Sequence, residues 1–175
     1  SGTRQAAKRC LLYLEHPHMQ VAGRLSCRLI DGENHLFTAG RERTVIVYKG
    51  VKIRMLICYD VRFPVWARNE SGFDYDLLLV PANWPEIRIP YWDCMIASRA
   101  TENQCFIAAC NPVGDDAYGN HYNGHSVAYD TRLHPIVHFR DNEVGTKIAE
   151  FDIGTLGHFR QASPLWKDTD RFVLL

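Results

Sequence analysis

The stretch Ile57-Cys58-Tyr59-Asp60-Val61-Arg62-Phe63-Pro64 decides how the rest of the chain is interpreted. It follows the apolar and β-branched run 51–57, which favours a buried strand. Pro64 is well suited to the first turn of a helix, because its missing N–H is not needed there. Cys58 is therefore expected where a strand gives way to a tight turn and a helix.

The neighbouring segments extend this pattern in both directions. Residues 44–48 are separated from 51–57 by Lys49-Gly50, which predicts a hairpin with a two-residue turn. Apolar spacing predicts helices at 64–69 and 92–103, a helix start near the end of 151–160, and a loop at 111–124. Further strands are expected at 77–80, 105–110, 125–129, 133–138 and 146–153, and an extended tail at 163–175. This order predicts an α/β sheet layered with helices.

Composition limits the possible partners. The 175 residues carry 20 basic and 20 acidic side chains, so the balanced charge argues against nucleic acid or an anionic membrane as the main partner. No apolar run approaches the roughly 20 residues that cross a bilayer, and a cytoplasmic protein with a small-molecule or protein partner is expected. His121, His125 and His134 match no common ligand spacing, so no metal is predicted. The six cysteines are scattered singly, at positions 10, 27, 58, 94, 105 and 110.

Cys58 has two interpretations on local chemistry. Unpaired backbone N–H groups at a helix start favour a thiolate and can receive an oxyanion, as a nucleophile requires. Free cysteines are also commonly buried, so Cys58 could simply complete a core strand. The local pattern alone leaves both open.

Several other motifs occur in step with residues 57–64. They are Thr38-Ala39-Gly40, Val80-Pro81-Ala82-Asn83-Trp84-Pro85, residues 98–104, Cys110-Asn111-Pro112-Val113-Gly114 and Tyr122-Asn123-Gly124-His125-Ser126. In order and content they resemble the nitrilase superfamily of carbon-nitrogen hydrolases over roughly residues 28–166. The Ala-Asn-Trp-Pro element with Arg-Ala-x-Glu-Asn is similar to the omega-amidase-like group.

The resemblance implies a nitrilase-type αββα sandwich, here N-terminally truncated, that assembles into homo-oligomers. It implies hydrolysis of a small carboxamide through a thioester on Cys58, without a metal or organic cofactor. A carboxylate would move protons, and a cation with the backbone N–H of Tyr59 would stabilise the oxyanion. Asn83 and Trp84 are implied to lie close to the nucleophile as oxyanion or substrate contacts, although core packing also explains the aromatic ring.

Three further groups are expected from the family pattern. Glu33 stands where a second glutamate belongs, although a solvated loop carboxylate is the alternative. Register places Gly23 where the family has lysine, and the adjacent Arg24 is a doubtful replacement because a guanidinium differs in shape and reach. If residues 35–37 are aligned to the lysine segment instead, Glu33 replaces the lysine, so both alignments remove the cation. Glu15 is the only carboxylate within residues 1–28, in no family context.

These gaps divide the chain into a divergent segment at 1–28 and the C-terminal part of a carbon-nitrogen hydrolase domain at 29–175. Two hypotheses follow. One is an omega-amidase-like hydrolase with Cys58 as nucleophile and Glu33 assisting. The other is a catalytically inactive fragment or binding module, which the missing lysine and general base favour, because losing one member of a cooperating catalytic group costs several orders of magnitude in rate.

Overall fold

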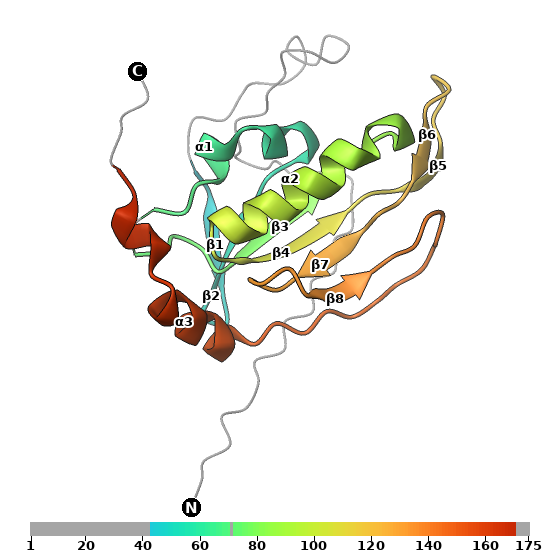
Figure 1. Ribbon diagram of the computed structural model, residues 1–175. Helices are drawn as coiled ribbons and strands as arrows, with labels where there is room; N and C mark the ends of the chain where they lie inside the picture. The colour runs from blue at the N-terminus through green and yellow to red at the C-terminus, as the bar shows by residue number, and fades with distance from the viewer. Residues whose placement is uncertain (1–42, 71, 171–175) are drawn as a thin grey trace, which may run out of the picture.

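The computed structural model describes residues 43–70 and 72–170. A six-stranded mixed sheet lies at its centre, with helices on both faces (Figure 1). The strands are β1 Val45–Tyr48, β2 Val51–Met55, β3 Leu77–Pro81, β4 Phe106–Cys110, β5 Val113–Asp115, β6 His121–Asn123, β7 Val127–Tyr129 and β8 Pro135–His138. The helices are α1 Pro64–Ala67, α2 Ile89–Glu102 and α3 Ile153–Ala162, with 3-10 turns η2 Cys58–Arg62, η3 Glu86–Arg88 and η4 Leu165–Asp168.

The sheet has the order β1-β2-β3-β4-β7-β8. Its central strands β2, β3 and β4 run parallel, and the outer pairs are antiparallel. The predicted β1–β2 hairpin is confirmed, and its turn residues Lys49 and Gly50 have φ values of 48° and 79°, as a two-residue turn with the twist of the strands requires. Parallel strands need crossovers, which η2–α1 and α2 supply.

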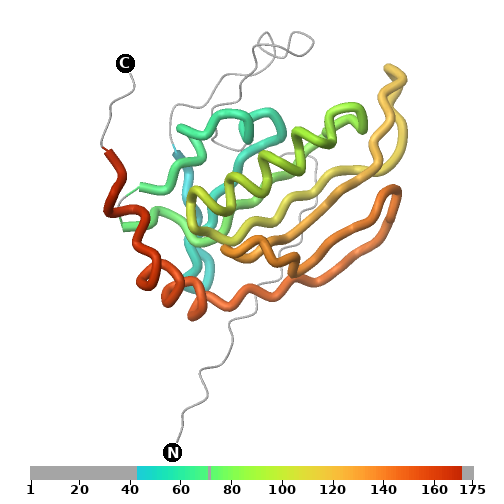
Figure 2. Tube along the Cα trace, viewed as in Figure 1, coloured from blue at the N-terminus to red at the C-terminus, as the bar shows by residue number. Residues whose placement is uncertain are grey.

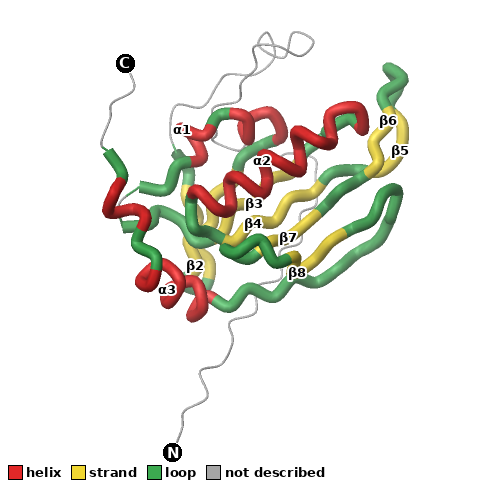
Figure 3. Tube along the Cα trace, viewed as in Figure 1, coloured by secondary structure: helices red, strands yellow, loops and turns green. Residues whose placement is uncertain are grey.

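Two apolar clusters hold the layers together. On one face, α2 buries Trp92, Ile96 and Ala100 against the sheet. On the other face, Leu156 of α3 packs in a cluster with Phe106 and other strand residues. Figures 2 and 3 show α3 on the side of the sheet opposite α2. The predicted α/β class is confirmed.

The C-terminal third contains three differences from the sequence prediction. The strand predicted at 146–153 is wrong, because residues 146–152 are irregular and Asp152 caps α3 by accepting hydrogen bonds from the N–H groups of Gly154 and Thr155. Within the described part of the tail that was predicted to be extended, residues 165–168 form η4. The loop predicted at 111–124 contains the β5–β6 hairpin, whose three-residue strands are too short and polar for a clear pattern.

No helix within residues 43–70 and 72–170 is long and apolar enough to cross a membrane.

Candidate active site

Cys58 is the first residue of η2 and follows shortly after the end of β2, as the sequence predicts. Its φ of 43° lies in the left-handed region, which is uncommon for a residue with a side chain. Such strained residues persist where the surroundings over-determine them and gather at active sites and ligand clamps. The backbone of Cys58 is therefore held in a specific, unfavourable conformation.

The turn that follows Cys58 is fixed by buried polar groups. The backbone N–H of Ile57 donates to Oδ2 of Asp60 at 3.1 Å, which closes the turn beneath the thiol. Arg99 of α2 donates through Nε to the carbonyl of Val61 at 2.9 Å and is paired with Glu102 at 3.0 Å. The helix layer thus positions η2, and with it the cysteine.

The Cys58 thiol is half-buried and donates to the backbone carbonyl of Asn83 at 3.7 Å. Burial raises the pKa of this thiol from 9.0, as does the charge of Asp60, while hydrogen bonding to the backbone of Tyr59 and the charge of Arg62 lower it. The five-residue η2 turn has too little dipole to reverse the effect of burial. In the surroundings formed by the described residues, the protonated thiol of Cys58 is favoured over the thiolate. A nucleophilic Cys58 would therefore need a base to remove its proton.

Asn83 and Trp84 follow β3 and lie next to the cysteine segment, but in different surroundings. Asn83 is exposed and borders a pocket of about 400 Å³ whose other wall is the β5–β6 hairpin with Tyr122 and Asp116. Trp84 is buried against Trp92 with ring centroids 5.6 Å apart, and its indole N–H donates to the carbonyl of Arg88.

The segment 83–84 is clamped by one buried side chain. Asn111 accepts from the Trp84 N–H at 2.6 Å and donates to the Trp84 carbonyl at 3.0 Å and to the Gly124 carbonyl at 2.6 Å. The amide therefore ties the end of β3 to the loop after β6. These contacts join three of the sequence motifs, one of which contacts Cys58 through Asn83.

Arg62 is the group in this region whose arrangement the sequence does not reveal. Its guanidinium carbon lies 4.5 Å from the Trp84 ring centre, 5.4 Å from that of Tyr59 and 5.9 Å from that of Tyr91. Its Nε is buried and has no hydrogen-bond partner within the described chain. Three aromatic rings therefore surround the charge. Its position four residues after Cys58 was the available signal.

Tyr122 extends the site toward the β5–β6 hairpin. Its hydroxyl donates to Oδ2 of Asp116 at 2.9 Å, and its pKa is raised by burial, by Asp116 and by the charge that Cys58 can carry. Glu33 lies outside the described residues, as do Glu15, Gly23 and Arg24. The described residues contain no group of three side chains suited to a metal ion.

Comparison with known proteins matches this arrangement to one family. The sequence model of the carbon-nitrogen hydrolases matches residues 28–161. The chain belongs to the carbon-nitrogen hydrolase family. Relatives include the omega-amidase YafV of Yersinia enterocolitica, 44% identical over 144 residues that make up 82% of this chain and 56% of that protein. The 2-oxoglutaramate amidase of Bacillus subtilis is 36% identical over 78% of this chain and 52% of its own length.

Solved structures give the same family for this chain. XC1258 of Xanthomonas campestris, a CN-hydrolase superfamily protein with an arsenic adduct in its active site, aligns with a TM-score of 0.74 at 39% identity, covering 82% of this chain and 57% of that one. Nit3 of Saccharomyces cerevisiae, a nitrilase-superfamily member, aligns with a TM-score of 0.64 at 30% identity over 77% and 49%. The predicted family and nitrilase-type fold are confirmed. The chain spans about half the length of the relatives it matches.

Proposed function

We propose that this chain carries the nucleophile of an omega-amidase, an enzyme that hydrolyses the terminal amide of a small dicarboxylic acid monoamide. The observation that carries the proposal is Cys58, held at φ 43° at a strand end with its thiol facing the backbone of Asn83 and Tyr59. Relatives named omega-amidase and 2-oxoglutaramate amidase support this substrate class. They favour it over an inactive binding module.

The proposed chemistry proceeds in two stages. A base takes the Cys58 proton, and sulfur bonds to the amide carbon to give a tetrahedral oxyanion beside the Tyr59 N–H. The carbon-nitrogen bond then breaks, the proton passes to the leaving nitrogen, and ammonia departs from a thioester. Water, losing a proton to the same base, attacks the thioester and releases the carboxylic acid and the thiol. Glu33 is proposed as an assisting carboxylate.

Arg62 supports the choice of an acid-bearing amide. The guanidinium has an unpaired, buried Nε and is held in place by three aromatic rings near the nucleophile. Carboxylates form strong hydrogen bonds with charged donors, and the planar guanidinium group of arginine binds a carboxylate in a fixed geometry. We therefore propose that Arg62 binds the carboxylate at the far end of the substrate, while the amide lies at Cys58 and Asn83 and Trp84 form the neighbouring wall.

The proposal extends to location and assembly. Cys58, Cys94, Cys105 and Cys110 are free thiols, as expected in a reducing compartment such as the cytoplasm. Homo-oligomer formation is part of the proposal through the family resemblance.

The test is ammonia release from succinamate, followed together with the intact mass of the protein. We expect release in the unmodified chain, a transient acyl adduct on Cys58, and loss of at least about 1,000-fold in rate for Cys58→Ala. Cys94→Ala, on the exposed side of α2, is the matched control and should retain the rate. Absence of both ammonia and adduct from a folded sample would reject the amidase in favour of the inactive module.

A further inference from the structure

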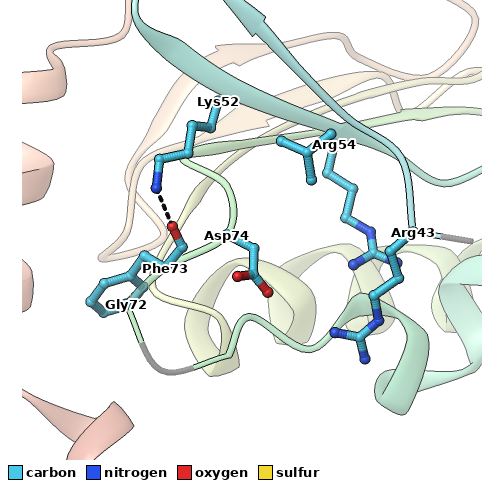
Figure 4. A pocket seen from close by; sticks show the side chains of 7 residues that line it. Arg43, Lys52, Arg54, Gly72, Phe73 and Asp74 are labelled. Atoms are coloured by element: carbon cyan, nitrogen blue, oxygen red, sulfur yellow. Dashed lines mark hydrogen bonds between the residues drawn. The ribbon is translucent and has the colours of Figure 1, made fainter.

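A second pocket lies beside the β1–β2 hairpin, away from Cys58 (Figure 4). It measures about 460 Å³, within the range of small-molecule sites. Its lining is Arg43, Val45, Lys52, Arg54, Gly72, Phe73 and Asp74. It shares none of these residues with the pocket beside Asn83. The loop 72–74 leads into β3 whereas Cys58 follows β2, so the parallel pairing places the two at opposite strand ends.

Arg54 is the group in this pocket that calls for a ligand. Lys52 and Arg54 alternate with Val51 and Ile53, so both basic side chains project from the same sheet face. Arg54 is 3% exposed, and its Nη1 is buried without a hydrogen-bond partner within residues 43–70 and 72–170. A buried charged donor that is left unpaired is costly, and an acceptor that enters the pocket would relieve this cost.

The other basic groups have partners already. Arg43 donates to Glu70 at 2.6 Å and to the carbonyls of Val65 and Arg68, so its charge is balanced. Lys52 donates through Nζ to the carbonyl of Phe73 at 2.5 Å. Burial lowers the pKa of Arg54, the charge of Tyr75 raises it, Arg43 lowers it, and Asp74 raises it. The Arg54 guanidinium also lies 5.8 Å from the centre of the Tyr75 ring, which leaves Nη1 as the donor of this residue that lacks a hydrogen-bond acceptor.

Asp74 determines what kind of anion fits. Its carboxylate lies between Lys52 and the two guanidinium groups in the view of Figure 4. It accepts a hydrogen bond from the backbone N–H of Glu70 at 3.3 Å. A phosphate or a dicarboxylate would bring a second negative charge against this carboxylate. A ligand with one carboxylate and one ammonium group satisfies both sides.

We propose that this pocket is a second binding site that takes a free α-amino acid, whose carboxylate is bound by Arg54 and whose ammonium group is bound by Asp74. Arg43 and Lys52 are the flanking walls. Val45 adds an apolar wall. The site operates without Cys58.

The test is calorimetric titration of the full chain with the twenty common L-amino acids, with propanoate and ethylamine as probes that carry only one of the two charges. We expect at least one amino acid to bind with a dissociation constant below about 1 mM. Propanoate and ethylamine should each bind at least tenfold more weakly than the amino acid that binds most tightly. The same titration in Cys58→Ala should give an unchanged constant, which separates this site from the amidase proposal.

Variants make the assignment specific. Asp74→Asn should weaken amino-acid binding at least tenfold while leaving propanoate binding unchanged, and Arg54→Met should remove both. Lys49→Met in the hairpin turn and Asp168→Asn in η4 are matched charge controls outside the pocket and should bind as the parent does. The proposal is overturned if no amino acid binds, if propanoate binds as tightly as the amino acid, or if Asp74→Asn in a folded protein leaves binding unchanged.

Discussion

Cys58 and Cys105 are both free thiols beside central strands, and each has an arginine nearby, yet their surroundings differ. Cys105 is fully buried, and its pKa is raised to about 12 by burial. Cys58 is half-buried, lies at φ 43° and faces backbone groups. The turn after β2 leaves the Cys58 thiol half-buried, whereas the start of β4 buries the Cys105 thiol completely.

The two arginines differ in the same way. Arg160, beside Cys105, donates to Asp76, to the carbonyl of Gln104 and to the carbonyl of Tyr75 at 2.8–2.9 Å. Arg62, beside Cys58, is held by aromatic rings and retains an unpaired Nε. A satisfied guanidinium stabilises the fold, and an unsatisfied one is available to a ligand.

Thiol alkylation gives the largest expected contrast. In the folded chain, iodoacetamide should modify Cys58 at least about 1,000-fold faster than Cys105, because a fully buried thiol reacts only after opening of the structure. Peptide mass mapping over time measures both rates. In urea the two rates should become similar, which controls for the intactness of the Cys105 thiol. Comparable rates without denaturant would contradict the difference in burial.

Arg160→Met tests the structural arginine. Both Arg160 and Asp76 are 8% exposed, and removing one partner leaves the other buried and unpaired, so we expect a loss of about 3–5 kcal/mol in the free energy of unfolding. Urea denaturation measures it. Arg132→Met is the milder control, because the Arg132 guanidinium lies over the ring of Phe159, which is in α3 next to Arg160. A loss no larger than that of the control would show that Arg160 is dispensable.

Arg62→Met tests the available arginine, and its effect should fall on the substrate rather than on the fold. We expect kcat/KM for succinamate to fall about 100-fold, or about 2.7 kcal/mol, because the carboxylate loses a charged donor. Propanamide, which has no carboxylate, should lose less than about threefold. Steady-state ammonia release with both amides measures the difference. Equal losses for the two substrates would assign Arg62 a purely structural role.

Local pattern was sufficient for much of the fold. Residues 44–57 have the alternation and the Lys49-Gly50 turn of a hairpin, and the prediction was confirmed. The strand predicted at 146–153 also alternates, but Asp152 offers its carboxylate to the start of a helix, and this capping prevails. Periodicity without a pairing strand does not make a strand.

The site could be predicted only in part. Cys58 and its turn lie within one motif, so their position follows from sequence. Of the rings around Arg62, Tyr59 belongs to the same turn, but Trp84 and Tyr91 are distant in sequence and reach Arg62 only through packing of η2, the segment after β3 and α2. The unpaired Arg54 likewise depends on burial. The role of Glu33 stays a prediction.

Alkaline stability gives the smallest and most specific contrast. The pKa of Cys105 is raised by burial from 9.0 to about 12 in the folded protein. Above pH 9 the unfolded chain loses this proton while the folded chain keeps it. The contribution of the Cys105 thiol to the free energy of unfolding is therefore complete below pH 9 and falls as pH rises toward 12. The slope from this one group is about 1.4 kcal/mol per pH unit. Cys105→Ala should remove that contribution between pH 9 and 11, leaving the further fall due to Tyr75, whose pKa burial also raises. Urea midpoints at several pH values measure the slopes, and Cys94→Ala should keep the parent slope. An unchanged slope in Cys105→Ala would mean that the Cys105 thiol titrates alike in the folded and unfolded states.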